Sequence, residues 1–286
     1  MFGRVLALFV MLLITVTGCH IDIDISDTNP TLSSRERYTE NLTRIVDGIG
    51  AERVVAQTSN GNIDVAGTTD GVVRVQIRKV VRALNLSEAE DYARDVQVFV
   101  KRRGSAVHVY KEHPRFPRDV QVEVSYDILC PARLDINLRT SNGNIEIRDV
   151  EAVTQVKTTN GNVQFRGNPG YLEIKTSNGN IRASVIQLRD VAQFETTNGR
   201  VAVVVHSGVA PISAATTNGS IDVTLPTDFS GKLDASTVNG QAQSAFDISR
   251  PTGSRQNRLS GTLGSGGDTL VQLRAVNGNV SLWKLQ

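Results

Sequence analysis

The chain of 286 residues carries 31 lysines and arginines against 29 aspartates and glutamates, a formal net charge of +2. This balance lacks the concentrated basic face that nucleic-acid binding requires, so we expect no nucleic-acid partner. Aromatic residues make up only 5% of the chain, and there are two cysteines.

The N-terminal segment is typical of a secreted lipoprotein. Arg4 precedes an apolar run at 5–16 that is too short to cross a bilayer as a helix, and the letters VTGC place small residues directly before Cys19. This ending resembles the lipobox of bacterial lipoproteins, in which the cysteine is acylated. The alternative is an ordinary secretory signal with an incidental cysteine. We predict a signal peptide at 1–18 and a lipid anchor on Cys19, which makes the membrane a partner.

A polar stretch follows, and residues 19–43 are expected to form a tether between the lipid and a folded body at 44–286. The expected location is the cell envelope. It is the outer membrane if the host has two membranes, because His20 stands where an aspartate commonly retains lipoproteins in the inner one. With Cys19 lipidated, Cys130 has no disulfide partner, and we expect it to be a buried small hydrophobe.

Between residues 72 and 130, strand-like runs surround one helix. Ser87 followed three residues later by Glu90 is a capping-box pattern, and it predicts a short helix over 86–96. Alternating apolar residues predict strands at 72–81, 96–102, 106–111 and 120–130. We interpret this region as the first coils of a repeat domain that the inserted helix widens.

The dipeptide Asn-Gly recurs along the chain, and its spacing predicts the fold. Its copies begin at residues 60, 142, 160, 178, 198, 218, 239 and 277, so the central copies are 18 to 21 residues apart. Apolar and polar residues alternate on both sides of each copy, which predicts two strands per repeat with one buried face each. The stretch 246–268, rich in Gly, Ser and Arg, is interpreted as a loop or a coil lengthened on one side.

Two architectures fit this pattern. Asn-Gly between alternating strands is a strong hairpin signal, so each repeat could be an antiparallel hairpin. Alternatively, each repeat is one coil of a parallel β-solenoid, in which equivalent residues stack at ~4.8 Å and form ladders. We favour the solenoid, because a hairpin turn requires neither Thr two residues before Asn-Gly nor a second Asn after it. The predicted fold class is all-β: a single-stranded, right-handed parallel β-helix with one short inserted helix.

The repeat alignment predicts ladders and a buried face. The Asn and Thr ladders are expected to bond along their own columns, with a positive φ at the following glycine; their members are Asn142, Asn160, Asn178, Asn198, Asn218 and Asn239, and Thr140, Thr158, Thr176, Thr196, Thr216 and Thr237. Asn178 should have two ladder neighbours, and Asn277, at the C-terminal end, one. The interior is expected to contain one column of Val156, Ile174, Phe194, Ile212 and Leu233, and opposite it Val163, Ile181, Val201 and Ile221.

A combination of motifs resembles a known family. The letters LSEAEDYARDV, DILCPA, TSNGNI and GTLGSGGDTLVQLRAVNGNV are similar to those of bacterial β-strand-repeat proteins called "putative adhesins", a domain of unknown function. The resemblance covers roughly residues 44–286. It implies a β-helix body, and it provides no catalytic residues to transfer.

The sequence contains no motif that predicts catalysis, a cofactor or a metal. His108, His113 and His206 lack the paired spacing of metal ligands, and there is no nucleophile elbow, phosphate loop or dinucleotide fingerprint. One outward strip is interpreted either as a shallow anion or glycan groove or as a solvated charged face: Arg139, Lys157, Lys175, Glu173 and Glu195.

The predicted function is a non-enzymatic envelope lipoprotein for interaction, adhesion or scaffolding, with an envelope protein or a glycan as partner. The alternative is an enzyme or binding module that acts on envelope or extracellular polysaccharide through an outward face of the β-helix.

Overall fold

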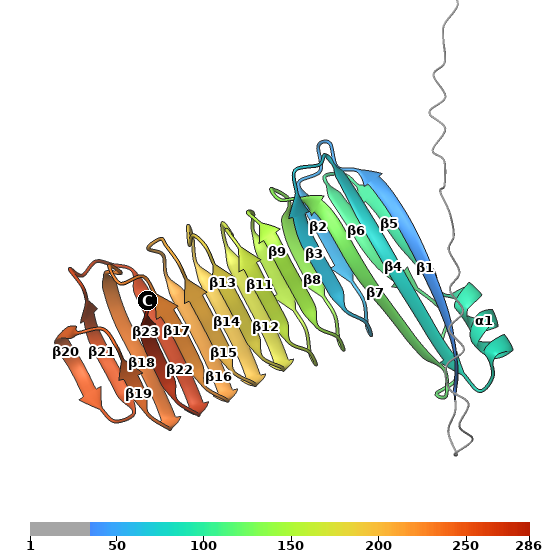
Figure 1. Ribbon diagram of the computed structural model, residues 1–286. Coiled ribbons are helices and arrows are strands. Elements are labelled where there is room, and N and C mark those ends of the chain that lie inside the picture. The colour runs from blue at the N-terminus through green and yellow to red at the C-terminus, as the bar shows by residue number, and fades with distance from the viewer. Residues whose placement is uncertain (1–34) are drawn as a thin grey trace, which may run out of the picture.

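The computed structural model describes residues 35–286. Within this range the chain forms 23 strands and one helix, and the strands belong to two sheets that run the length of an elongated body (Figure 1). The expected signal peptide at 1–18 and the anchor residue Cys19 lie outside the described residues. No helix within 35–286 is long and apolar enough to cross a membrane.

The strands alternate between the sheets along most of the chain. Sheet A has the order β1-β4-β7-β3-β9-β11-β13-β15-β17-β23-β19. Its strands are β1 (Glu36–Asp47), β3 (Ile63–Thr68), β4 (Val72–Ala83), β7 (Gln121–Pro131), β9 (Ile145–Val150), β11 (Val163–Gly167), β13 (Ile181–Val185), β15 (Val201–Val205), β17 (Ile221–Leu225), β19 (Ala242–Ser244) and β23 (Val280–Lys284).

Sheet B has the order β20-β21-β18-β22-β16-β14-β12-β10-β8-β2-β6-β5. Its strands are β2 (Arg53–Gln57), β5 (Gln97–Arg103), β6 (Ala106–Glu112), β8 (Asp135–Arg139), β10 (Thr154–Lys157), β12 (Leu172–Asn178), β14 (Ala192–Asn198), β16 (Ile212–Asn218), β18 (Gly231–Asn239), β20 (Ile248–Arg255), β21 (Arg258–Leu263) and β22 (Leu270–Asn277).

In the central part of the molecule, each strand pairs in parallel with strands one repeat away. Ile174 of β12 lies beside Val156 of β10 and Phe194 of β14, which are 18 and 20 positions distant. The strands on the two sides of one Asn-Gly, β12 and β13, belong to different sheets, so they do not form a hairpin. The all-β class and the parallel stacking are confirmed, and the right-handed sense stays a prediction.

The space between the sheets is the apolar core. Every residue expected in the interior is at most 3% exposed: Val156, Ile174, Phe194, Ile212, Leu233, Val163, Ile181, Val201 and Ile221. The first five do not form the single column that was expected, because Ile212 is in register with Ala192 and Val271, one inward position away from Phe194. Inward positions recur every second residue, so each strand contributes to two adjacent columns.

The asparagine before each glycine belongs to a continuous hydrogen-bonded ladder. The spatial order of the ladder is Asn60, Asn142, Asn160, Asn178, Asn198, Asn218, Asn277 and Asn239. From Asn142 onward, each Nδ2 donates to the Oδ1 of the preceding member at 2.7 or 2.8 Å. The asparagine after the glycine has another role. Its Oδ1 accepts a backbone N–H of the next coil, as Asn144 does from Asn162 at 2.9 Å. These two sets of hydrogen bonds explain why asparagine is present both before and after the glycine.

The threonines bond differently from the expectation. Thr176 Oγ1 donates to the carbonyl oxygen of Gly161 at 3.1 Å, and not to a threonine of the neighbouring coil. The equivalent bonds are Thr140 to Gly61, Thr158 to Gly143, Thr196 to Gly179, Thr216 to Gly199 and Thr237 to Gly278. All six threonines are buried, so each hydroxyl needs an acceptor, and the glycine carbonyl provides it.

The glycines are required by close approach of the coils more than by a positive φ. Gly143 and Gly219 have φ values of 157° and 154°, but Gly161, Gly179 and Gly199 are not among the residues with positive φ. In every one of these five turns, an added Cβ would lie 1.9–2.0 Å from the carbonyl oxygen of the preceding coil's glycine. The expectation of a positive φ throughout this column is therefore wrong.

The order of coils in space differs from their order in the sequence. The last strands, β22 and β23, lie between the β16–β17 coil and the β18–β19 coil. At the other end, β2 and β3 lie between β6–β7 and β8–β9. Asn277 is therefore an interior member of the ladder and Asn239 its last member, which contradicts the expected position of Asn277. Because β18 and β22 carry equivalent letters, the repeat spacing alone does not order them.

We expect Asn277→Ala to destabilise the protein more than Asn239→Ala. Asn277 has ladder bonds to both Asn218 and Asn239, whereas Asn239 has one ladder bond, to Asn277. The difference in the free energy of unfolding should be about 0.5–1.5 kcal/mol, the net contribution of one hydrogen bond. Urea unfolding of both variants measures it. A larger loss for Asn239→Ala would contradict this order of coils.

Both ends of the stack are built from antiparallel strands. At one end, β1 pairs with β4, β4 with β7, and β5 with β6; at the other, β21 pairs with β18 and β20 (Figure 1). The interpretation of 72–130 as coils is correct for β6 and β7, which pair in parallel with β2 and β3, and wrong for β4 and β5. The segment 246–268 contains the antiparallel pair β20–β21 and is not a loop. These strands cover the edges of the parallel stack, which would otherwise be free to pair with another chain. The boundary expected between residues 43 and 44 falls inside β1.

The helix α1 (Leu86–Asp95) covers the antiparallel end. Its N-cap is Asn85, whose Oδ1 accepts the Glu88 N–H at 2.9 Å, while Asn85 Nδ2 donates to Glu88 Oε1 at 3.0 Å. The N-cap is therefore Asn85, two residues before the Ser87 of the expected Ser87–Glu90 pair. Both pairs have the same spacing, and asparagine caps a helix as well as serine does.

Two buried polar groups belong to this end. Lys79 is 4% exposed, donates to the carbonyl oxygens of Ala93 and Val96 at 2.7 and 3.2 Å, and forms an ion pair with Glu40. It thereby joins α1 and β4 to β1. Cys130 is fully buried in β7, as expected, and burial raises the pKa of its thiol to about 12.

Candidate functional site

The charged strip lies on the outward face of sheet B. Arg139, Lys157, Lys175 and Glu195 occupy one row on the successive strands β8, β10, β12 and β14. Lys175 Nζ lies 2.8 Å from Glu173 Oε1 and 3.7 Å from Glu195 Oε2. The hydrogen bond and charge of Glu173, supported by Glu195, raise the pKa of Lys175. In this half of the strip, the single cation is therefore paired with two carboxylates.

The other half of the strip keeps its positive charge. Arg139 and Lys157 are exposed, and neither has a carboxylate within 4.0 Å among the described residues. Their row continues towards the antiparallel end, through Gln57 of β2 and Tyr110 of β6. The row therefore joins two neighbouring cations to a polar and an aromatic side chain.

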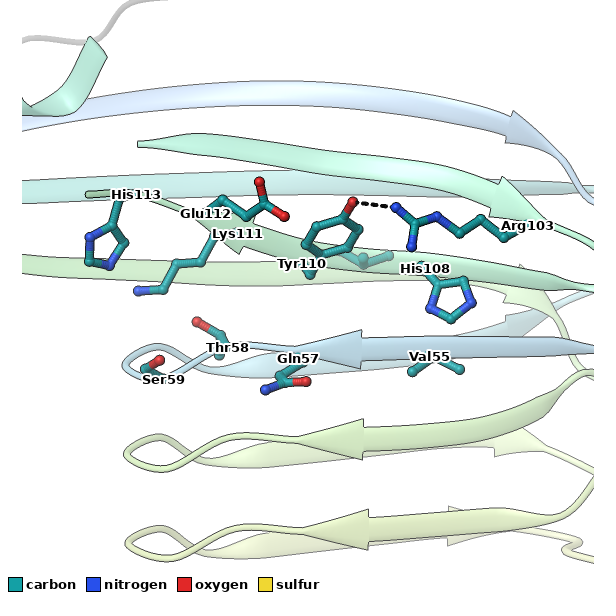
Figure 2. Close-up of a pocket in the computed structure, with 11 residues that line it drawn as sticks. Val55, Gln57, Thr58, Ser59, Arg103, His108, Tyr110, Lys111, Glu112 and His113 are labelled. Carbon is teal, nitrogen blue, oxygen red and sulfur yellow. Dashed lines mark hydrogen bonds between the residues drawn. The ribbon is translucent and has the colours of Figure 1, made fainter. Parts of the chain in front are cut away.

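A hollow opens over β2 and β6 beside this row (Figure 2). Its volume is ≈ 470 Å³, and its lining is mostly polar: Val55, Gln57, Thr58, Ser59, Arg103, His108, Val109, Tyr110, Lys111, Glu112 and His113. A second hollow of ≈ 660 Å³ shares Ser59, Lys111 and His113 with the first and adds Arg82 and Arg115. Four lysine and arginine side chains thus line the two hollows, against the carboxylates of Glu112 and Glu123.

Two aromatic rings hold two of the cations near the hollow. Arg103 Nη2 donates to the Tyr110 hydroxyl at 3.0 Å (Figure 2), and its guanidinium lies 5.7 Å from the ring centroid. Lys101 Nζ lies 4.1 Å from the centroid of Phe99, whose ring is 5.2 Å from that of Tyr110. These cation–π contacts orient the two side chains but leave their positive charges without a counter-charge.

Lys111 and His113 form the part of the hollow nearest α1. Burial lowers the pKa of Lys111, and the charge of Glu123 opposes that effect. The His113 ring stacks on Phe116 with centroids 5.0 Å apart, and Phe116 packs at the same distance against Tyr92 of α1. These contacts attach the rim of the hollow to the helix.

The arrangement is suited to binding an anion. His108 and His113 both line the hollow, whereas His206 lies elsewhere and its Nε2 is 3.2 Å from Ser184 Oγ. Within residues 35–286, no group of three His, Cys, Asp or Glu side chains is placed to hold a metal ion. Four cations on or beside the row, Lys101, Arg103, Arg139 and Lys157, have no ion pair in the described part of the chain.

Sequence reasoning found only part of this site. Arg139 and Lys157 were identified because their strands follow the regular repeat. Tyr110, Phe99 and Arg103 were missed, since β6 pairs with β2 across an irregular segment whose register no repeat indicates. The available signal was the alternation in VFVKRR and AVHVYK, which places aromatic and basic residues on the outward face.

A second charged cluster lies on the outward face of sheet A. Asp127, Asp64 and Glu146 are in register on the adjacent strands β7, β3 and β9. The pKa of Asp64 is raised to about 6, first by burial, then by the charge and hydrogen bond of Asp127 and by the charge of Glu146, while Arg148 partly opposes the rise. Like charges directly opposite each other in a sheet destabilise it.

We expect Asp64→Asn to raise the melting temperature at pH 7–8. A carboxyl with a raised folded-state pKa contributes stability that is fully present below its unfolded pKa, near 3.8, and is lost as the pH rises through about 6. The advantage of the variant should therefore disappear near pH 4. Differential scanning fluorimetry across this range measures both melting curves. A gain that is equal at pH 4 and pH 8 would show that repulsion is not its cause.

Comparisons with known proteins agree with this architecture at the level of the family. A family model described as Toastrack DUF4097 matches residues 17–283. No curated protein matches the chain at a significant level.

Similar solved structures have low identity to the chain. A "putative adhesin" from Bacteroides fragilis is 17% identical with a TM-score of 0.42, and the match covers 86% of this chain and 97% of that one. A "putative cell adhesion protein" from Clostridium sporogenes is 11% identical with a TM-score of 0.38, covering 86% and 100%. A "putative lipid binding protein" from Parabacteroides distasonis is 12% identical with a TM-score of 0.35, covering 86% and 97%.

Proposed function

The chain belongs to the Toastrack DUF4097 family, and from this premise we propose that it is a non-enzymatic, lipid-anchored protein of the cell envelope whose all-β body serves interaction, adhesion or scaffolding. The observation that carries the proposal is the outward face of sheet B. There, a hollow adjoins a row that contains two neighbouring cations, Arg139 and Lys157, with no carboxylate partner in the described structure. Such a surface is arranged to receive a charged partner.

The scaffold supports this role because it holds the surface rigid. The asparagine ladder has seven side-chain hydrogen bonds in series, and it runs beside parallel strands that keep a constant register. A binding surface on such strands loses little conformational entropy when a partner arrives. The same scaffold also suits a spacer that presents its surface away from a membrane.

A glycan array and a reducing-sugar assay on the same glycans test the proposal. The full-length lipidated protein, purified in a non-ionic detergent, should bind one or more envelope or extracellular glycans without releasing new reducing ends. Release of reducing ends would contradict it and would favour the alternative of an enzyme that acts on polysaccharide, with His108, Glu112 and His113 in the hollow as the first residues to substitute.

The anchor is tested by substitution of Cys19. We expect Cys19→Ser to abolish incorporation of a fatty-acid analogue and to leave the protein unprocessed or released from the membrane. Cys130 is a matched control, because it is buried in the body and its substitution should leave labelling intact. Equal labelling of Cys19→Ser and the wild type would contradict the lipoprotein proposal. If the host has two membranes, the labelled protein should fractionate with the outer one.

A further inference from the structure

We propose that the row Tyr110–Gln57–Arg139–Lys157, together with the hollow beside it, binds an acidic polysaccharide: a linear glycan that carries carboxylates on its sugar rings. This inference deepens the proposed function and rests on it, because it names the ligand class of the same surface. In the described structure, this face combines an open concavity with exposed cations that have no ion pair.

The charges on this face favour an acidic ligand. Several other exposed cations on sheet B have carboxylate partners, as Lys175 has Glu173, and as both Arg258 and Arg274 have Asp234. Arg102 of β5 instead donates to the backbone carbonyls of Ile49 and Gly104. Arg139 and Lys157 lie on adjacent strands and have no carboxylate partner in the described residues. Lys101 and Arg103, on β5 beyond Tyr110, also have no carboxylate partner there. Neighbouring like charges destabilise a sheet, and a bound polyanion would remove that repulsion.

The spacing of the row suits a linear polymer. Tyr110, Gln57, Arg139 and Lys157 lie on four successive strands, β6, β2, β8 and β10, which are ~4.8 Å apart. The row is therefore perpendicular to the strands, and its spacing is comparable to the length of one sugar ring. A linear glycan lying across the strands would place consecutive rings over consecutive side chains. The neutralised Lys175 marks the end of the cationic row.

The side chains that line the hollow suit a sugar. Its lining combines the partly exposed ring of Tyr110 with the amide of Gln57, the hydroxyl of Ser59 and the ammonium of Lys111. Aromatic rings pack against the apolar faces of sugars, while amides and hydroxyls bond to sugar hydroxyls, and a few polar groups in a concave site fix orientation. A flat bilayer surface would reach exposed lysines and arginines but not the floor of a concavity, so a glycan fits this site better than a lipid membrane does.

The test compares two double substitutions that remove the same charge. In the first, Arg139→Gln and Lys157→Gln remove the cationic row. In the matched control, Arg166→Gln and Arg182→Gln remove two exposed arginines from β11 and β13 of sheet A, which also have no ion pair in the described structure. Unchanged melting temperatures establish that both variants fold.

Binding is measured by isothermal titration calorimetry with the full-length lipidated protein in non-ionic detergent. The probes are polygalacturonate, alginate and hyaluronate, and the neutral reference is fully methyl-esterified polygalacturonate. We expect binding to at least one acidic polymer, at least a tenfold loss of affinity in the sheet B variant, and a change of less than twofold in the sheet A variant. Affinity should fall as salt increases, and the methyl ester should not bind.

Several results would overturn the inference. They are no binding to any of the three acidic polymers, equal losses in the two double variants, equal binding of the methyl ester, or binding only to vesicles of phosphatidylglycerol and phosphatidylcholine. The outcome also separates this inference from the proposed function. Binding of neutral glycans that the sheet B variant retains, without new reducing ends, would leave the proposed function intact and refute the acidic ligand. New reducing ends would refute the proposed function itself.

Discussion

Gly179→Ala is expected to lower the free energy of unfolding by at least about 3 kcal/mol. This loss is at the upper end of the range for substitutions that add one methyl group to a packed site. The new Cβ would lie 1.9 Å from the carbonyl oxygen of Gly161 in the adjacent coil, and because that oxygen belongs to the backbone, no side-chain rotation can relieve the contact. Relief requires the two coils to move apart, which would weaken the ladder bond between Asn178 and Asn160 and the bond from Thr176 to the Gly161 carbonyl.

Gly170→Ala is the matched control, because an added Cβ at Gly170 meets no heavy atom within 4 Å. Its effect should stay within about 0.5 kcal/mol, as for most surface substitutions. Chemical unfolding in urea gives the free energy of unfolding for both variants. Equal stability of Gly179→Ala and Gly170→Ala would show that the coils do not approach each other as closely as the structure indicates.

Phe194→Ala is expected to cost about 3–5 kcal/mol, the range for removing a large buried ring from a packed core. Phe194 is 2% exposed, and in the neighbouring coil it is in register with Ala214, which is too small to fill the space that the ring would leave. The cavity should therefore persist in the variant. Gln193→Ala, at the adjacent outward-facing position, is the control and should change stability little. Urea unfolding that finds equal losses for the two substitutions would place Phe194 outside the core.

The regular part of the fold could be predicted from the sequence because the chain repeats its contacts. Each coil stacks on an almost identical one, so the residues that recur around Asn-Gly are those that contact each other between coils. The spacing of 18 to 21 residues indicated that these coils pair in parallel. The roles of individual side chains were less accessible. Thr176 bonds to a glycine carbonyl, and Gly179 is needed for close approach, which only the distance between coils reveals.

The two ends of the stack could not be predicted in the same way. Which strand lies at the edge of a sheet depends on the segment that covers it. The coils of β18 and β22 have such similar sequences that the repeat pattern fits either order of the two coils. The antiparallel strands β4, β7 and β21 alternate apolar and polar residues just as parallel ones do. Alternation identifies a strand and its buried face, but it does not specify the direction of its partner.

The candidate site was half predictable for the same reason. Arg139 and Lys157 lie in the regular repeat, so their columns could be aligned by counting from Asn-Gly. Tyr110 and Gln57 are 53 positions apart in the sequence and meet only because β2 lies between β6 and β8. The cations could therefore be predicted from the sequence, but the hollow beside them could not.

The central claim is that the outward face of sheet B contacts a partner in the cell envelope, and site-specific photo-cross-linking in living cells tests it most directly. A photoreactive amino acid at Gln57 would lie in the row between Tyr110 and Arg139, and the same amino acid at Gln164 of β11 would occupy an exposed position on sheet A. We predict that irradiation yields adducts of higher mass at Gln57 and none at Gln164. Equal adducts at both positions, or none at Gln57, would contradict the claim.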